Sequence, residues 1–176
     1  MSIRKIQNVY TGKVVRLNIE SVELPNGRLA DLEIIHHPGG AAIVAVDDQS
    51  RVCLIRQYRH AGGGWIWELP AGKLEPDEPP LHTAQRELVE EAGRSATRWQ
   101  PLGTMLSSPG VFDEVIHLFL ARDLRATALA HEETELIEVH WLPMTQACRQ
   151  VLDGEITDAK TAVGLLRAQH ALDGEA

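Results

Sequence analysis

The pattern of polar and apolar positions between residues 14 and 37 indicates two extended segments. Residues 14–24 and 28–37 both fit an extended segment, and Pro25-Asn26-Gly27 between them carries a strong signal for a tight turn. We therefore predict an antiparallel β-hairpin extension in the N-terminal part of the chain.

Two apolar runs follow this hairpin. Residues 41–46 are apolar throughout, and after Asp47-Asp48 a second apolar run covers residues 52–55. Continuous runs of this length indicate strands that are buried on both faces. Further strands are expected at residues 65–69, 115–121 and 137–142, and helices at residues 144–152 and 157–169. The mixture predicts an α/β protein with a mixed β-sheet sandwiched between helices (α/β/α).

A helix is also expected between residues 80 and 92. Pro79 and Pro80 suit a first helical turn, where a missing N–H costs little, and Gly93 is placed to end the helix in a left-handed conformation. At about 100° per residue, this helix has an apolar side and an adjoining acidic side. The apolar side carries Leu81, Ala84, Leu88 and Ala92, and the acidic side carries Glu87, Glu90 and Glu91.

The three carboxylates of this helix repel one another, by roughly a few tenths of a kcal/mol per exposed pair and by more when they are partly buried. A cation should therefore offset them, and Arg86 lies to the side, where it fills only part of that role. Oxygen ligands with no cysteine nearby favour Mg²⁺ or Mn²⁺ over zinc. A bare acidic helix face is more often simply hydrated, so the spacing alone leaves both interpretations open.

Composition narrows the class of protein. The 176 residues are 44% hydrophobic, which suits one well-packed domain and is too short a chain for two large ones. No apolar run approaches the roughly 20 residues that span a bilayer, and the first residues lack an apolar signal segment, so we expect a cytoplasmic protein without a membrane partner. The formal charge of −8 disfavours binding to nucleic acid. Cys53 and Cys148 fit two reduced thiols better than a disulfide framework.

The stretch from Gly72 to Arg94 fits the pattern G-x5-E-x7-R-E-U-x-E-E-x-G-U, in which U is a bulky apolar residue. Every position of fixed identity matches, and the chain therefore resembles the Nudix hydrolases. The last U position departs from the pattern, because Arg94 occupies it just after the end of the helix. This departure affects local packing and leaves the acidic residues in place.

Further segments resemble one Nudix branch, the ADP-ribose pyrophosphatases. A proline follows the motif by about fifteen residues in that branch, and Pro109 stands at that offset from Arg94. Without the motif, a proline in a Ser-Pro-Gly turn would indicate loop geometry only. The other matching segments are Arg56-Gln57-Tyr58-Arg59, Glu68-Leu69-Pro70-Ala71-Gly72 and Glu132-Glu133-Thr134-Glu135.

The resemblance implies a metal-dependent catalytic site. The expected ion is Mg²⁺, with Mn²⁺ as the alternative, and its implied ligands are the backbone carbonyl near Ala71 and the side chains of Glu87, Glu90 and Glu91. Glu90 and Glu91 also belong to the implied catalytic set. Glu135 is expected to act as the general base, with Glu133 as the next choice.

Other residues are implied to bind substrate or to support the site. Arg59 ends a strand, and its planar guanidinium would grip a phosphate or ribose oxygen. Arg56 has the opposite pleat parity and fits a solvent-facing position equally well. The implied substrate-binding set is Arg56, Arg59, Glu68, Pro109, Gly110 and Glu114. The implied supporting set is Gly72, Glu78 and Arg86, with Glu78 paired to Arg86.

The implied activity is Mg²⁺-dependent hydrolysis of the pyrophosphate bond of ADP-ribose or a related ADP-sugar, which gives AMP and a sugar phosphate. GDP-mannose, another nucleotide sugar or a dinucleotide is the alternative substrate. Hydrolysis of damaged nucleoside triphosphates is disfavoured by Pro109 and the N-terminal segment. A Nudix module that binds a nucleotide without catalysis is disfavoured by the complete set of acids.

The resemblance also implies the Nudix fold in two parts. Residues 1–38 would form antiparallel strands that pair between two subunits, and residues 39–176 would form the hydrolase domain. We therefore expect a homodimer that acts on a small-molecule nucleotide sugar.

Overall fold

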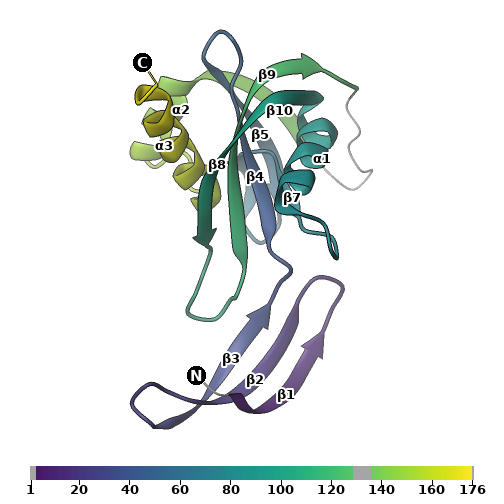
Figure 1. Cartoon of the computed structure of the whole chain (residues 1–176), viewed down its shortest axis with the longest axis vertical. Coiled ribbons are helices and arrows are strands. Elements are labelled where there is room, and N and C mark those ends of the chain that lie inside the picture. Colours follow the sequence, from purple (N-terminus) through teal and green to yellow (C-terminus); the bar gives the residue numbers. More distant parts are fainter. Residues whose placement is uncertain (1–2, 129–135, 176) are drawn as a thin grey trace. The chain divides into compact units, whose positions relative to one another are not determined.

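The computed structural model describes residues 3–128 and 136–175. The chain divides into two compact units. One contains residues 1–39 and 106–115, and the other contains residues 40–105 and 116–176. Each unit has its own sheet structure (Figure 1).

The smaller unit contains a three-stranded antiparallel sheet in the order β1 (Ile3–Thr11), β2 (Arg16–Glu23) and β3 (Leu29–His36). The predicted hairpin is present as β2 and β3, and Gly27 adopts a positive φ of 78° in the turn between them. The sequence did not indicate β1, because every residue of this strand is exposed and no face of it carries a continuous apolar pattern.

Residues 106–115 join this small sheet although they lie far along the chain. Ile35 pairs with Phe112 in a parallel bridge. The Ile35 N–H donates to the Val111 carbonyl at 2.7 Å, and the Asp113 N–H donates to the Ile35 carbonyl at 3.1 Å. The loop that carries Pro109 is therefore fastened to β3 through backbone hydrogen bonds.

The larger unit contains two sheets and three helices. One sheet has the order β10-β5-β6, and the other has the order β7-β4-β9-β8, with β4 and β9 parallel. The strands are β4 (Gly40–Ala45), β5 (Arg51–Arg59), β6 (Gly64–Glu68), β7 (Ala71–Lys73), β8 (Arg94–Leu106), β9 (Val115–Ala126) and β10 (Ile137–Pro143). The helices are α1 (Pro80–Ala92), α2 (Met144–Leu152) and α3 (Ala159–Asp173).

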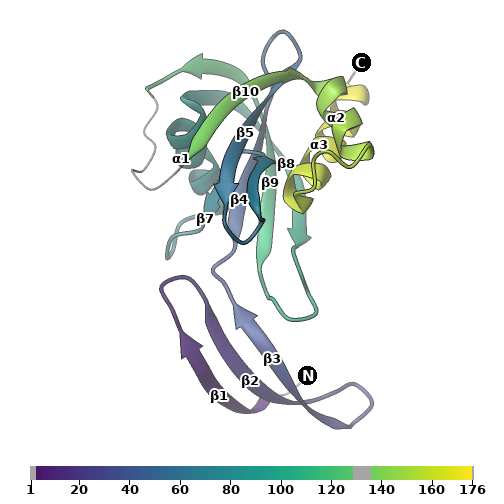
Figure 2. The same ribbon diagram turned by 180° about the vertical axis from the view of Figure 1, so that it is seen from behind.

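Strand β4 lies between two hydrophobic cores. Every residue of β4 is buried, which explains why its sequence is apolar throughout rather than alternating. Ala42 and Val44 face one core with residues of α2 and α3, while Ala41 and Ile43 face the other core with residues of α1. Helices therefore cover both faces of the sheet structure, as Figure 2 shows for α1 on one side and α2 and α3 on the other. The predicted α/β/α architecture is confirmed.

The ends of α1 agree with the sequence prediction. Pro79 and Pro80 lie at the first turn, and Gly93 ends the helix with φ of 59°, its N–H directed to the carbonyls of Leu88 and Val89. Strand β8 begins directly after this cap and was not predicted, because its exposed and half-buried residues lack a regular period. Among the described residues, no helix has the length and apolar character needed to cross a membrane.

The packing of α3 against β4 and Leu69 predicts the effect of one small substitution. A Cβ at Gly164 would lie 2.6 Å from Leu69 Cδ1 and 3.3 Å from Val44 Cγ2. Gly164→Ala should therefore lower the free energy of unfolding by about 1–2 kcal/mol, although alanine is the better helix former by about 1 kcal/mol. Urea denaturation measures this change.

A double-mutant cycle provides the control for this overpacking. Leu69→Val removes the methyl group that would collide with the new Cβ, so the double variant should be more stable than the sum of the two single losses predicts. Strict additivity, or a stabilising Gly164→Ala, would contradict the close packing of α3.

Candidate active site

The acidic side of α1 is largely buried against strand β7. Glu87 and Glu91 are buried, and Glu91 is only 2% exposed, whereas the side chain of Glu90 is 39% exposed. The apolar side of the same helix, with Ala84, Leu88 and Ala92, packs into the core beside β4. The core contact thus fixes the helix rotation that turns its carboxylates toward β7.

A single guanidinium holds three of the carboxylates around this helix. Arg86 Nη1 donates to Glu87 Oε1 at 2.5 Å and to Glu90 Oε2 at 3.1 Å. Its Nε and Nη2 donate to Glu78 at 3.3 and 3.1 Å, and Nη2 also reaches the Lys73 carbonyl at 3.4 Å. The pairing of Glu78 with Arg86 that the sequence indicated is present.

Glu78 fastens the loop before α1 to the helix. Its Oε2 also accepts from the Thr83 hydroxyl at 2.8 Å. The hydrogen bonds from Arg86 lower the pKa of Glu78 to about 2; burial works against this shift, and Thr83 and the Glu75 N–H add to it. The carboxylate form of Glu78 is therefore strongly favoured in the folded protein.

Glu87 and Glu91 both lie against the backbone of β7. Glu91 Oε2 accepts from the Ala71 N–H at 2.7 Å. A Cβ at Gly72 would lie 1.9 Å from Glu87 Oε1, so only glycine leaves room for that carboxylate. The structure thus gives a steric reason for Gly72, and it brings two acids of the helix to neighbouring positions on the same strand.

The chemistry of this donor set fits a divalent cation. Arg86 offers one positive charge to three carboxylates, which leaves an excess of two negative charges, and Glu91 raises the excess to three. Oxygen donors with excess negative charge are what Mg²⁺ and Mn²⁺ require. Across residues 3–128 and 136–175, no three such side chains stand in a finished metal-binding geometry. Arg86 donates hydrogen bonds to the carboxylates of Glu87 and Glu90, so a bound metal ion would have to take the place of Arg86 at some of these oxygens.

A second charged cluster lies where β6 ends. Glu68 is only 1% exposed, and Arg59 Nε and Nη2 donate to its two oxygens at 2.8 and 3.0 Å. Lys160 Nζ donates to Glu68 Oε2 at 2.6 Å. Burial raises the pKa of Glu68, but the hydrogen bonds of Arg59 and the charge of Lys160 outweigh it and lower the pKa below its ordinary value.

Arg59 is the more accessible member of this cluster. Its side chain is 43% exposed, and the hydrogen bond to Glu68 is the main cause that raises its pKa, with Glu91 among the further charges that do so. Arg56, on the opposite face of β5, lies 5.3 Å above the ring of Trp67. The two arginines are thus separated by the pleat, and only Arg59 takes part in the Glu68 cluster.

The remaining expected substrate residues that the structure describes belong to the smaller unit. Pro109 and Gly110 lie in a turn in which the Phe112 N–H donates to the Ser108 carbonyl at 2.9 Å. Glu114 pairs with His37 Nδ1 at 3.2 Å. The general base candidates Glu135 and Glu133 lie outside the described residues.

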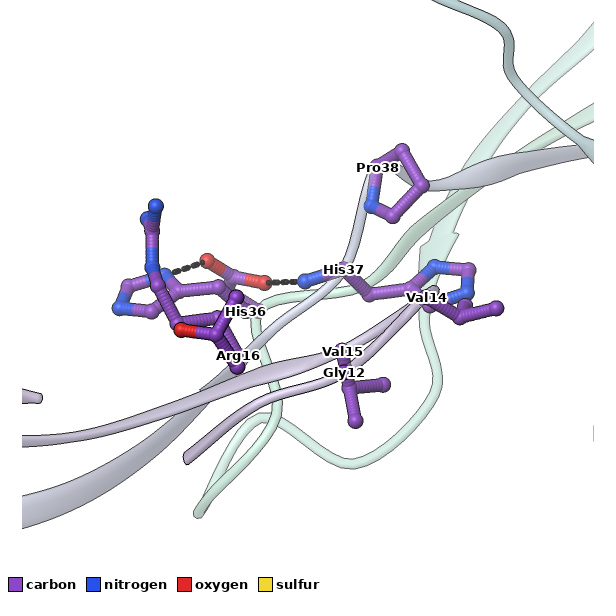
Figure 3. A pocket seen from close by; sticks show the side chains of 9 residues that line it. Gly12, Val14, Val15, Arg16, His36, His37 and Pro38 are labelled. Carbon is purple, nitrogen blue, oxygen red and sulfur yellow. Dashed lines mark hydrogen bonds and ion pairs between the residues drawn. The ribbon is translucent and has the colours of Figure 1, made fainter. Parts of the chain in front are cut away.

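The smaller unit also contains a pocket of about 400 Å³ beside β3, shown in Figure 3. His36 Nδ1 lies 2.5 Å from Asp113 Oδ2, and His36 Nε2 lies 2.8 Å from Glu20 Oε1. The His37 N–H donates to the other oxygen of Asp113 at 2.9 Å. These bonds add side-chain contacts to the backbone bridge that fastens residues 106–115 to β3.

Arg94 explains how the chain tolerates its departure from the motif. Its guanidinium carbon lies 5.5 Å above the ring of Trp141, and its Nη1 donates to the Gly93 carbonyl at 2.9 Å. The flat guanidinium thus covers an aromatic surface in the place of a bulky apolar side chain.

Sequence reasoning missed Lys160 and its neighbours in the Glu68 cluster. Asp158 caps α3 by accepting from the Thr161 N–H at 3.0 Å, and Thr161 Oγ1 accepts from the Leu69 N–H at 2.8 Å. An Asp three residues before a Thr at a helix start is a recognisable cap signal. That signal does not indicate which strand the start of the helix will contact, so it could not predict the contact of Lys160 with Glu68.

The fold and the site together define an α/β/α protein. The acidic side of helix α1 suits a divalent cation, and Glu68 holds Arg59 in a second charged cluster. The sequence matches the NUDIX domain over residues 36–163, and the chain therefore belongs to the Nudix family. Nudix hydrolases generally use divalent metal ions.

Several relatives align along nearly the whole chain. The ADP-ribose pyrophosphatase of Bacillus subtilis (strain 168) is 39% identical over 173 residues, which cover 96% of this chain and 94% of that protein. The ADP-ribose pyrophosphatase of Mycobacterium tuberculosis is 40% identical over 169 residues, which cover 94% of this chain and 81% of that protein. The methanol dehydrogenase activator of Bacillus methanolicus is 38% identical over 172 residues, which cover 96% and 93%.

A solved structure supports the fold. The crystal structure of an ADP compounds hydrolase superposes with a TM-score of 0.85 and covers 99% of this chain and 95% of its own. Its sequence identity is 22%, so the likeness concerns the fold alone.

The low pKa of Glu78 predicts how one substitution changes acid stability. A carboxylate with a pKa lowered from 4.5 to about 2 stabilises the fold fully above pH 4.5, and this contribution is lost as the pH falls toward 2. Glu78→Gln should therefore be less stable than the wild type near neutral pH, and the difference should shrink below about pH 4.5. Urea denaturation across this range measures the difference, and one that stays constant with pH would contradict the assignment.

Proposed function

We propose that this protein hydrolyses the pyrophosphate bond of ADP-ribose or a related ADP-sugar, giving AMP and a sugar phosphate, in a reaction that requires Mg²⁺ or Mn²⁺. The main support is the near full-length alignment with two ADP-ribose pyrophosphatases. The complete acidic motif on α1 agrees with the proposal, because every carboxylate that the reaction needs from this helix is present.

Glu87, Glu90, Glu91 and the Ala71 carbonyl would hold the metal. When bound, a divalent ion neutralises phosphate oxygens and lowers the pKa of a coordinated water molecule. The chain itself supplies the orientation of these ligands. Packing of α1 against the core fixes the helix rotation, and Arg86, anchored by Glu78, keeps Glu87 and Glu90 close to each other.

Arg59 would bind the substrate. Two of its nitrogens are held by the buried Glu68, so its guanidinium has a fixed plane, and its exposed side can donate to phosphate or ribose oxygens. Glu135 would accept the proton of the attacking water, with Glu133 as the alternative. Pro109, Gly110 and Glu114 would contribute further substrate contacts.

We also propose that the protein is a homodimer. Strand β1 is an edge of its sheet, and exposed apolar side chains along it include Ile3, Ile6, Val9 and Tyr10. An exposed apolar edge strand is a ready surface for pairing with a second chain. These features support a subunit interface that includes β1.

Light scattering coupled to gel filtration tests this state. At micromolar concentration the particle mass should be about twice the chain mass of 19.5 kDa, and Ile6→Lys combined with Val9→Lys should shift it toward the monomer. A wild-type monomer with full hydrolytic activity would contradict the dimer proposal.

The activity is tested by turnover of ADP-ribose, GDP-mannose, NADH, a diadenosine polyphosphate and an oxidised nucleoside triphosphate, each with Mg²⁺ and with a chelator. ADP-ribose should be the preferred substrate, and chelation should abolish turnover. Glu90→Gln should reduce kcat by roughly a hundredfold or more, because it removes a negatively charged metal ligand. Preference for another substrate would contradict the assigned specificity, and no turnover of any substrate would favour a nucleotide-binding module.

Matched variants in the same assay distinguish the loss of a site carboxylate from the loss of a negative charge elsewhere on the protein. Glu155→Gln alters an exposed acid beyond α2 and should leave turnover unchanged. Glu135→Gln should lower kcat more than Glu133→Gln if Glu135 is the base. Full activity of Glu90→Gln with Mg²⁺ would contradict the metal role.

A further inference from the structure

The start of α3 is attached to the strand that carries Glu68. The Leu69 N–H, which is next to Glu68 in the chain, donates to Thr161 Oγ1 at 2.8 Å. The Thr161 hydroxyl in turn donates to Asp158 Oδ2 at 2.6 Å, so the helix cap and the strand share one hydrogen-bonded chain. Lys160 precedes Thr161, and its ion pair with the carboxylate of Glu68 is a second, charged contact between this helix and the strand.

Two positively charged side chains contact the buried carboxylate of Glu68. Arg59 bonds both of its oxygens, and Lys160 Nζ bonds Oε2 at 2.6 Å, so Oε2 accepts from both cations. Lys160 is itself largely buried, with a side chain 17% exposed, and Asp158 Oδ1 lies 3.1 Å from Nζ. The Lys160 ammonium therefore has a fixed position between a helix cap and the strand.

A purely structural purpose explains this arrangement poorly. Buried ion pairs contribute little to stability relative to apolar residues of the same shape, because removing charges from water costs about as much as their attraction returns. Thr161 already attaches the helix to the strand through a neutral hydrogen bond. The additional charged contacts all converge on the carboxylate that holds Arg59.

The geometry leaves one side of Arg59 available. Its Nε and Nη2 face Glu68, and within the described part of the chain no acceptor is bonded to Nη1. Lys160 lies between Glu68 and Asp158, so the formal charges of Arg59, Lys160, Glu68 and Asp158 balance. The contact of Lys160 with Glu68 Oε2 holds the carboxylate that fixes Arg59, and the exposed edge of Arg59 can then donate to a ligand from a fixed position.

We propose that Lys160 is a positioning residue for substrate binding: it holds Glu68 and, through Glu68, fixes the Arg59 guanidinium so that its exposed edge can bind the phosphate or ribose oxygens of a nucleoside diphosphate sugar. This inference rests on the proposed function of the site. Lys160 touches no reacting atom, and its effect is transmitted by one carboxylate.

Steady-state kinetics with ADP-ribose and Mg²⁺ tests the proposal. Lys160→Met should raise KM by about tenfold with kcat within about twofold, because Arg59 binds the substrate equally before and during the reaction. Lys160→Arg, which keeps the charge, should stay within about threefold of the wild-type KM. Lys160→Gln replaces the methionine variant if that variant does not fold.

Two control variants show whether a change in KM comes from the position of Lys160, from lower stability of the protein or from its altered net charge. Thr161→Val removes the neutral attachment of the same helix without changing charge, so it should lower the melting temperature and leave KM close to that of the wild type. Arg98→Gln removes an equal charge from an exposed ion pair with Glu175 and should change neither quantity appreciably. A KM effect of Thr161→Val equal to that of Lys160→Met would overturn the proposal, as would an unchanged KM in Lys160→Met.

The wild-type protein separates the failure of this inference from the failure of the proposed function. If the wild type does not turn over ADP-ribose, the proposed function fails first. Binding of AMP, measured by calorimetry without metal, then tests Lys160 directly. Lys160→Met should weaken AMP binding by about tenfold relative to the wild type and Thr161→Val, and equal affinities would overturn the role of Lys160.

Discussion

The close approach of the Glu87 carboxylate to the backbone of Gly72 is the constraint on which the site depends. No side chain fits at position 72, since a Cβ would lie 1.9 Å from Glu87 Oε1. Glu91, one helical turn further, bonds the neighbouring Ala71 N–H. Strand β7 and helix α1 are thus joined through carboxylates rather than through apolar contacts. The apolar side of α1 packs instead into the core beside β4. The same helix therefore stabilises the fold with one side and presents acids with the other.

Two neighbouring clusters in the larger unit differ in charge balance. Around Arg86, three carboxylates share one cation, whereas around Glu68 the two cations Arg59 and Lys160 are balanced by Glu68 and Asp158. The influence of Glu91 on the pKa of Arg59 shows that the clusters interact electrostatically. A ligand that combines phosphate oxygens with a divalent metal suits such a pair, because the acid-rich cluster attracts the metal and the exposed edge of Arg59 can donate to the phosphate. This complementarity gives the proposed function a physical basis independent of the relatives.

The sequence predicted the features that depend on local or strictly periodic signals. The prolines and Gly93 gave the ends of α1, and the unbroken apolar run of residues 41–46 gave a doubly buried β4. Strands β1 and β8 escaped prediction, because exposed strands with irregular burial carry no period to detect. The contact of Glu78 with Arg86 followed from motif spacing within one loop and helix. The contact of Lys160 with Glu68 joins residues 92 positions apart, and only the docking of α3 produces it.

The attachment of residues 106–115 to β3 affects how the chain can be divided. The NUDIX match starts at His36, so a cut placed at that boundary would appear to separate an accessory sheet from a complete domain. Such a cut would remove Ile35, whose N–H and carbonyl both bond the segment that carries Pro109. Gene fusions, circular permutations and domain exchanges between relatives should therefore transfer β3 and the Pro109 segment together, as one module encoded in two separate stretches of the gene.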